Sequence, residues 1–403
     1  MSMLMTALVA KRSRYPPNDK EQKRACRTDQ HAAAHPRIGG RGMRSVRYGI
    51  FQTRWDESML YRVIEASELP ALVEAFMETH EVVAPVKKGD VYAFDVISSP
   101  DEIELNYDQT VASPKKYFLP PVETLMTFDA RGNQVTDYTA EITPRVIFGA
   151  HACDINALNR LDVVCKEAPY KDPYYIARRE ATLIVGISCM PTDKCFCHLW
   201  SSDEARFGYD LFLQDIGGKY LVSISSNDAA NVLESACNPR EATDAERIEF
   251  RHATRRRQAA FNPDIPKIQE VAMLMDAFHE DPFWDELGGR CLSCTACSAV
   301  CPTCFCFDIR DTLDPDGATG RRERVWDACT APQFALVAGG HNFRSDGAKR
   351  VRHRMYHKLN GFLATHDRML CVGCGRCVTA CKANINPIEV LKFFERKGAA
   401  DAR

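Results

Sequence analysis

The sequence predicts an α+β protein in which an N-terminal α/β domain is followed by a smaller, cysteine-dense domain. Segments with the period of strands alternate with amphipathic helical segments over about residues 59–275, which is typical of an α/β domain. From Asp285 onward the composition changes, and two copies of one four-cysteine spacing follow. We therefore expect an extension over residues 1–58, an α/β domain over 59–275 and a second domain over 276–403.

The N-terminal extension mixes Arg, Lys, His, Pro and Gly without a sustained apolar period. Such a composition cannot bury enough apolar surface to order a chain, so we expect residues 1–58 to be disordered. Two explanations of this segment are open. An Arg-rich, acid-poor start is typical of a transit peptide, but an extension upstream of a natural start at Met59 is the simpler explanation.

The α/β domain opens with a strand and a helix. Residues 60–66 have strand character, and the segment Ser67-Glu68-Leu69-Pro70 then begins an amphipathic helix that runs through residues 71–80. The turn signal KKGD separates the next two strands. The further elements that we expect are strands over 82–86, 91–97, 145–150, 181–188 and 220–224 and a helix around 154–164.

Cysteine is the outlier of the composition, with 18 in 403 residues. No N-terminal apolar segment with a cleavage signal is present, so we expect a cytoplasmic protein whose cysteines stay reduced and serve as metal ligands. No run approaches the roughly 20 apolar residues of a membrane helix, which predicts no direct membrane insertion. The net charge of −2, from 52 basic and 54 acidic residues, predicts no nucleic-acid partner, because no global field attracts one.

The two cysteine runs share the spacing C-x2-C-x2-C-x3-C, and Pro302 follows the first. In this spacing three thiolates on a tight loop bind one [4Fe–4S] cluster, while the fourth ligates the other cluster. We therefore expect a ferredoxin-like 4Fe-4S dicluster domain with a long insertion, residues 302–370, between its motifs. The predicted ligands are Cys291, Cys294, Cys297 and Cys381 for cluster 1 and Cys371, Cys374, Cys377 and Cys301 for cluster 2.

Small residues in the second motif agree with this interpretation. Gly373 and Gly375 let backbone N–H groups approach cluster sulfurs, where hydrogen bonds raise the reduction potential. Lys382 stands where proline is usual after the fourth cysteine, but that proline binds no iron. The alternative is a pair of zinc sites, which would use two well-separated pairs of ligands rather than complete four-cysteine runs.

The insertion carries three further cysteines, Cys304, Cys306 and Cys329, and the basic stretch HNFRSDGAKRVRHRMYHK. The cysteines lack an obvious fourth ligand, and their role stays unassigned. The basic stretch has two interpretations, which the sequence does not separate. It is either a docking face for an acidic redox partner or a solvated helical face with arginines that pack around the clusters.

A candidate third metal site lies in the α/β domain. The segment Cys189-Met190-Pro191-Thr192-Asp193-Lys194-Cys195-Phe196-Cys197-His198 directly follows the apolar strand over 181–188, and Cys153 follows the strand over 145–150. Loops at the carboxyl ends of such strands carry the chemistry of α/β folds. If the two strands are neighbours, these residues would hold a third iron–sulfur cluster, or zinc with His198 as a competing ligand; alternatively, some are simply buried thiols. The candidate ligands are Cys153, Cys189, Cys195 and Cys197, whereas Cys26, Cys165 and Cys237 are isolated and expected to be structural.

Several catalytic motifs are missing from the sequence. We find no G-x-G-x-x-G after a strand, no nucleophile elbow, no phosphate-binding P-loop, no H-E-x-x-H helix and no separated C-x-x-C pairs of a nickel–iron centre. The sequence therefore predicts an electron-transfer chain with no catalytic residues of its own, which serves enzymes on other polypeptides.

A family resemblance covers the chain from about Met59 to Ile388. The segments SPKKYFLPPVETL, GAHACDINAL, DPYYIARR, CFCH, CPTCFCFDIRD, RERVWDAC, AGGHNFR and CVGCGRC closely resemble a family that includes the β subunits of cytosolic nickel–iron sulfhydrogenases and the corresponding iron–sulfur subunits of anaerobic sulfite reductases. The chain departs from its relatives at His151-Ala152, where Arg-Pro is usual. That departure puts any role of position 151 in doubt.

The resemblance implies a hetero-oligomeric oxidoreductase. Its flavin- and NAD(P)-binding subunit would exchange electrons with this chain, which would relay them to the catalytic subunit of a soluble nickel–iron hydrogenase. The alternative is the corresponding iron–sulfur subunit of an anaerobic sulfite reductase. A remote alternative from another class is a zinc-stabilised scaffold or redox sensor, which would be colourless.

Overall fold

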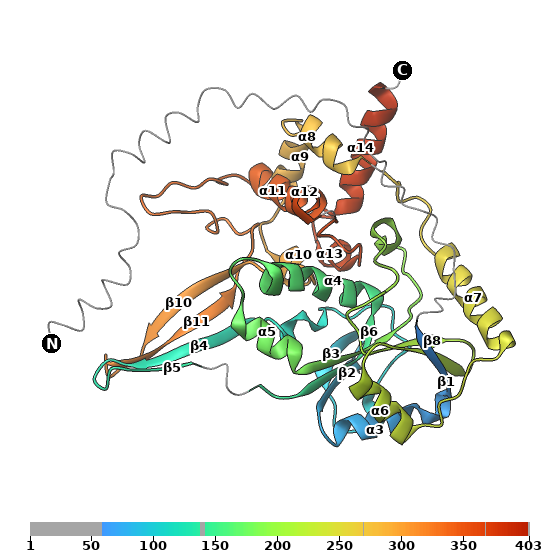
Figure 1. Ribbon diagram of the computed structural model, residues 1–403. Helices are drawn as coiled ribbons and strands as arrows, with labels where there is room; N and C mark the ends of the chain where they lie inside the picture. The colour runs from blue at the N-terminus through green and yellow to red at the C-terminus, as the bar shows by residue number, and fades with distance from the viewer. Residues whose placement is uncertain (1–58, 138–141, 269, 367, 402–403) are drawn as a thin grey trace. The chain divides into compact units, whose positions relative to one another are not determined.

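The computed structural model describes residues 59–401 except residues 138–141, 269 and 367 (Figure 1). The extension predicted over residues 1–58 lies outside the described residues. The described chain combines two β-sheets with helices, as the sequence predicts for a mixed α and β protein.

The larger sheet has seven strands. Its inner strands β2, β6, β7 and β8 run parallel, and antiparallel strands close both edges. Every strand predicted between residues 60 and 224 is present, whereas the short strand β8 was not predicted. In spatial order the sheet contains β1 (Leu60–Glu65), β9 (Lys219–Ile224), β8 (Leu211–Asp215), β7 (Thr182–Ile187), β6 (Arg145–His151), β2 (Glu81–Lys88) and β3 (Val91–Val96).

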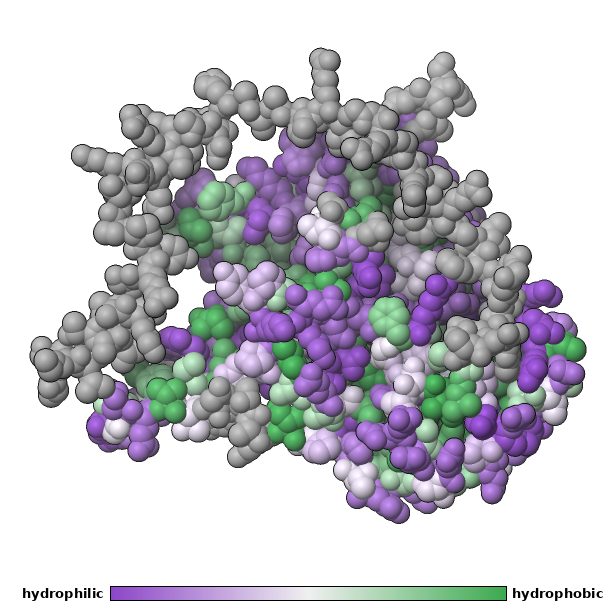
Figure 2. Space-filling view, viewed as in Figure 1, coloured by the Kyte–Doolittle hydropathy of each residue, from purple (hydrophilic) through white to green (hydrophobic). Residues whose placement is uncertain are grey.

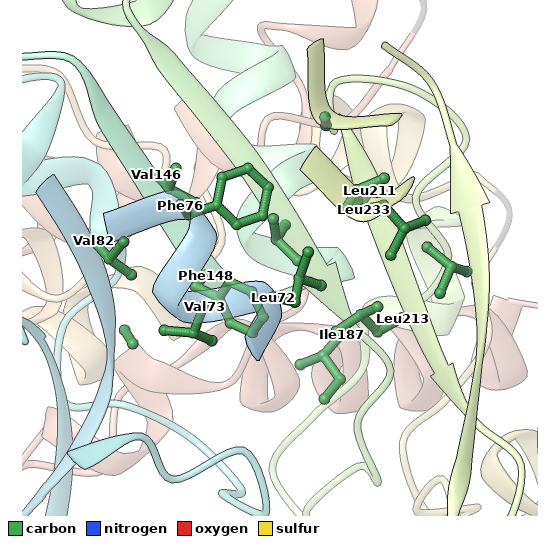
Figure 3. Packing of buried hydrophobic residues seen from close by; sticks show 14 of the residues in the cluster. Leu72, Val73, Phe76, Val82, Val146, Phe148, Ile187, Leu211, Leu213 and Leu233 are labelled. Atoms are coloured by element: carbon green, nitrogen blue, oxygen red, sulfur yellow. The ribbon is translucent and has the colours of Figure 1, made fainter. Parts of the chain in front are cut away.

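Helices cover both faces of this sheet. Helices α3 (Leu69–Met77) and α6 (Asn227–Ala236) cover one face, where Phe76 packs with Val146 and Phe148 of β6 (Figure 3). Because side chains alternate along a strand, Ile147 points to the other face, which α4 (Ala152–Asp162) and α5 (Pro173–Glu180) cover. Helix α5 begins where Asp172 accepts hydrogen bonds from two backbone N–H groups of its first turn.

A second, antiparallel sheet joins distant segments of the chain. Its order is β10 (Phe307–Leu313), β11 (Thr319–Trp326), β4 (Val122–Asp129) and β5 (Gln134–Asp137). Strands β10 and β11 come from the insertion between the cysteine motifs, and β11 pairs with β4 along its length. The insertion therefore completes a sheet that begins in the first half of the chain. The domain boundary at residues 275 and 276 stays a prediction.

The C-terminal part is helical around its own core. Trp284 and Leu287 pack against Met355 and Phe394 in a cluster of buried residues. Helices α9 and α11 approach so closely that a Cβ on Gly288 would lie 2.2 Å from the backbone nitrogen of Ala348. The helices are α7 (Asp244–Ala259), α8 (Val271–Ala277), α9 (Phe283–Arg290), α10 (Ala296–Ala299), α11 (Gly347–Leu359), α12 (Leu363–His366), α13 (Arg376–Ala380) and α14 (Pro387–Asp401). Single-turn helices lie at Ala66–Glu68, Pro100–Glu102, Pro114–Tyr117 and Cys197–Trp200, and Val163–Glu167 extends α4 by a π-helical turn.

Hydrophilic and hydrophobic residues are interspersed on the face that Figure 2 shows. None of the helices in the described part of the chain has the length and apolar content that crossing a bilayer requires.

The inserted hairpin is fixed by a buried ion network. Glu123 of β4 accepts a hydrogen bond at 3.0 Å from Arg324 of β11, and Arg178 of α5 pairs with the same carboxylate. Only 3% of the Glu123 side chain and 8% of the Arg324 side chain are exposed. Since removing one partner leaves a buried charge uncompensated, loss of one partner destabilises the junction more than loss of one partner of a surface pair would.

We expect E123Q to destabilise the protein by up to about 3–5 kcal/mol, because it removes the carboxylate that Arg178 and the buried Arg324 share and leaves Arg324 only its pair with Asp172. D311N is the matched control on the same hairpin, since Asp311 forms an exposed pair with Arg322 and its loss should not change stability measurably. Anaerobic denaturant titrations of both variants would test this. Equal midpoints for E123Q and D311N would contradict the assigned importance of the buried network.

Candidate metal centres

The two cysteine motifs fold into the same loop conformation. In each, the N–H group two residues after the first cysteine points to that cysteine's Sγ at 3.4 Å, from Ser293 to Cys291 and from Gly373 to Cys371. The Gly373 N–H thus points to a cysteine sulfur, while its approach to a cluster sulfur stays a prediction. Ser293 has φ of 52° and Gly373 has φ of 68°. A left-handed backbone costs a non-glycine residue roughly 1–2 kcal/mol, so the first motif keeps its loop shape at the expense of strain.

Cys301 lies with the cysteines of the second motif. A single cavity is lined by Cys301, Cys371, Cys374 and Cys377, the set predicted for cluster 2. This arrangement arises because the short helices α10 and α13 pack against each other, and Cys301 follows α10.

The first set is more open, since Cys294 is exposed and Cys291 and Cys297 are half-buried. Cys381 accepts a hydrogen bond at 3.2 Å from the Ile385 N–H in its own loop. The membership of Cys381 in the first set stays a prediction.

Two buried cations, Arg354 and Lys358, line the cavity of the second set, and a third, Lys115, contacts the neighbouring Cys304. The Arg354 guanidinium donates to the Sγ of Cys304 at 3.5 Å, Lys358 donates to the Thr303 hydroxyl at 2.9 Å, and Lys115 donates to the Cys304 carbonyl at 3.0 Å. A hydrogen bond from Cys304, with Lys358 and Arg354 nearby, holds the pKa of Cys301 well below its usual range, although burial opposes this. The chain thus stabilises a thiolate at this position.

These residues fit an iron–sulfur cluster. A [4Fe–4S] cluster with four thiolate ligands carries net negative charge, and buried cations are costly unless an anion compensates them. The cysteine-lined cavity and its buried cations supply both the ligands and the positive surroundings that such a group needs.

The candidate third site also forms one cavity. The strands β6 and β7 are parallel neighbours, the condition on which the sequence prediction depended. The cavity at their carboxyl ends is lined by all four predicted cysteines. Of these, Cys153 lies in the first turn of α4, and Cys189 follows β7. Cys195 lies in the loop beyond, and Cys197 begins the single-turn helix Cys197–Trp200.

The surroundings of the third site bear on the choice of metal. His198, the competing zinc ligand, is not among the lining residues, and its ring packs 4.1 Å from that of Phe261. Within the described residues, no three His, Cys, Asp or Glu side chains are placed to hold a single metal ion. Burial raises the pKa of Cys189 to about 12, so this thiol is protonated at neutral pH until a metal replaces its proton.

The third cavity and the cavity of the second set share a wall. Cys374 lines both. The Phe196 N–H donates to the Gly373 carbonyl at 2.8 Å, and the Cys195 Sγ lies 3.7 Å from the Cys374 carbonyl. A Cβ on Gly373 would lie 2.6 Å from the backbone nitrogen of Cys197. The glycine is therefore required for close approach of the two loops as well as for its own backbone conformation.

A buried ion pair fastens the second motif to the large sheet. Arg376 donates to both carboxylate oxygens of Asp154 at 2.7 and 2.9 Å, and at most 1% of either side chain is exposed. Arg376 also donates to the Thr110 carbonyl at 3.0 Å and hydroxyl at 2.9 Å. Asp154 neighbours Cys153, so one ion pair positions both cysteine sites.

The cysteines that the sequence left unassigned lie beside the second set. Cys304 forms a hydrogen bond with Cys301, and Cys306 forms one with Cys329. Cys237 lies in the core between the sheet and α6, and Cys165 lies in the core on the opposite face, which agrees with the structural roles expected for them.

Sequence reasoning missed the individual basic residues that face the clusters. Arg350, Arg354 and Lys358 are spaced four residues apart on α11 and are buried. The spacing was a usable signal, because residues at i, i+4 and i+8 share one face of a helix. For these residues the structure favours the packing around the cysteine sites that the second interpretation includes, but their burial shows that this face is not solvated.

The fold and the cysteine sites define an iron–sulfur electron-transfer protein. Residues 290–385 match a protein-family model described as a 4Fe-4S dicluster domain. The chain is also similar to sulfhydrogenase 2 subunit beta of Pyrococcus furiosus, with 35% identity over 334 residues, which cover 83% of this chain and 98% of the relative. The chain belongs to the family of sulfhydrogenase β subunits, as the sequence resemblance implies. No solved structure matches it.

We expect G373A to lower the iron content of the purified protein, because the added Cβ collides with the backbone of residues 196 and 197. G217A is the matched control, since Gly217 also has a positive φ but has open space around its Cα. Iron analysis of both variants separates the close approach from backbone strain. If both lose iron alike, strain alone would explain the loss at Gly373.

Proposed function

We propose that this chain relays single electrons between the catalytic subunit of a soluble nickel–iron hydrogenase and the flavin- and NAD(P)-binding subunit of the same complex. The observation that carries the proposal is that Cys374 belongs to two adjoining cysteine-lined cavities. Adjoining clusters provide a continuous path for electrons.

The path would use three [4Fe–4S] clusters. Cys371, Cys374, Cys377 and Cys301 would hold the middle cluster, and Cys291, Cys294, Cys297 and Cys381 the one toward the exposed Cys294. Cys153, Cys189, Cys195 and Cys197 would hold the third, at the carboxyl edge of the large sheet. Each cluster accepts and releases one electron, so a two-electron hydride step on a partner's flavin would be passed on as two single-electron steps.

The residues of this chain would bind and tune the clusters and would perform no proton chemistry. Backbone N–H groups such as that of Gly373 would stabilise the reduced state through hydrogen bonds to sulfur. Arg376 and Asp154 would hold the second and third sites in register. The catalytic chemistry at either end belongs to other subunits, and we place the complex in the cytoplasm, where thiols stay available for iron.

The cluster count tests the relay. We expect anaerobically purified protein to contain about twelve irons, with matching acid-labile sulfide, if all three sites hold [4Fe–4S] clusters. C197S should lose about four of them, whereas C237S should lose none, because Cys237 is a buried thiol away from the cavities. About eight irons in both the C197S and the C237S proteins would restrict the relay to two clusters. Zinc without iron would favour the scaffold alternative.

The partners test the complex. We expect a tagged chain, purified anaerobically from its native cells, to bring down a flavin-binding protein together with a nickel–iron catalytic protein, because the relative in Pyrococcus furiosus is a sulfhydrogenase β subunit. Mass spectrometry and hydrogen-dependent dye reduction would identify them. A siroheme protein with sulfite reductase activity in the same fraction would instead favour the sulfite reductase alternative.

A further inference from the structure

The buried face of helix α11 carries a stripe of three basic residues, Arg350, Arg354 and Lys358, which we call the basic stripe. Their exposed fractions are 8%, 5% and 3%. The apolar stripe one residue further along, at Val351 and Met355, packs into the C-terminal core. The core packing of the apolar stripe therefore fixes the direction in which the basic stripe points.

The basic stripe runs from the first cysteine motif to the second. Arg350 donates to the Ser293 hydroxyl at 3.0 Å, in the first motif. Arg354 donates to the Cys297 carbonyl at 2.7 Å as well as to the Cys304 Sγ.

Lys358 completes the stripe at the second motif. Its ammonium donates to the Thr303 hydroxyl, and its backbone carbonyl accepts from the Cys371 N–H at 3.1 Å. Lys358 and Arg354 both line the cavity of Cys301, Cys371, Cys374 and Cys377.

The charges of the basic stripe have no carboxylate partners among the described residues. Two other buried arginines do, since Arg376 pairs with Asp154 and Arg324 with Glu123. The buried Arg160 instead donates to two backbone carbonyls and the Ser202 hydroxyl. A buried cation without a counter-charge is strongly unfavourable. The anion that balances the stripe must therefore be the thiolates and the group that they bind.

The positive charge is distributed unevenly between the two sets of ligands. Lys358 and Arg354 line the cavity of the second set, although Arg354 also donates to the Cys297 carbonyl of the first set. Lys115, from the turn Pro114–Tyr117, adds a third cation, which donates to the carbonyl of the neighbouring Cys304. The first set has Arg350 near its loop, but its Cys294 is exposed to solvent, which screens charge. Reduction adds one negative charge to a cluster, so nearby buried cations favour the reduced state. Burial itself opposes reduction, but here the buried site also contains cations that have no carboxylate partner among the described residues, and these favour reduction.

We propose that the basic stripe makes the cluster at Cys301, Cys371, Cys374 and Cys377 the higher-potential member of the dicluster pair. The inference rests on the proposed binding of two [4Fe–4S] clusters. An electron shared between the two clusters would then reside mainly on the buried cluster, and the more exposed cluster would have the lower reduction potential. Arg354 and Lys358 act as tuning residues, because they change the driving force without binding iron.

The first test is an EPR-monitored redox titration of the full chain carrying K358Q. We expect the midpoint potential of the higher-potential signal to fall. At a given potential the ratio of reduced to oxidised cluster should decrease about tenfold, which corresponds to about 59 mV for one electron. K358R should largely restore it. The control K349Q removes an exposed charge on the same helix, where Lys349 pairs with Asp346, and should leave both potentials unchanged. A K358Q protein with full iron content and unchanged potentials would overturn the proposal.

The second test leaves the basic stripe intact. If K358Q loses iron, this test still shows which cluster has the higher potential. C294S replaces an exposed ligand of the first set with serine and should alter the spectrum and potential of the lower-potential signal only. A change in the higher-potential signal instead would overturn the proposal. Iron and sulfide analysis of the wild-type chain is the separate check on the clusters themselves, so absence of iron refutes the proposed function, whereas a reversed order of potentials refutes only this inference.

Discussion

The buried ion pair between Arg376 and Asp154 is the constraint on which the arrangement of the cysteine sites depends. Arg376 lies within the second motif, and Asp154 lies in the first turn of α4, at the carboxyl edge of the large sheet. A buried pair contributes little net stability, but loss of either partner is severe. The pair therefore acts mainly as a geometric lock, which holds the loop of Gly373 against the loop of Cys195.

Charge balance explains why several cations are buried near the second cysteine motif. The interior near the second motif contains Lys115, Arg354 and Lys358, none of which has a carboxylate partner among the described residues. A core of this kind is stable only when an anionic group occupies it. We therefore expect folding of this region to be coupled to binding of a metal centre, as it is in small metal-binding domains.

The inserted hairpin connects the same region to the first half of the chain. Its strand β11 pairs with β4, and Trp326 at the end of β11 lies under Lys115, whose ammonium is 3.9 Å from the ring centroid. The Trp326 indole N–H donates to the Leu119 carbonyl at 3.0 Å. The hairpin thus positions a cation from one part of the chain beside a cysteine from another.

The sequence by itself determined the strands of the large sheet, except β8, and predicted the two sets of four cysteines, of which the second lines one cavity. Both signals are local: side-chain alternation and fixed ligand spacing. It also indicated the third set, since Cys153 and Cys189 each follow an apolar strand. Only the tertiary structure decided that β6 and β7 are neighbours, that Cys374 lines two cavities and that Arg354 has no carboxylate partner among the described residues. Those facts depend on which distant segments pack together and on the balance of buried charge, and local sequence patterns do not encode either.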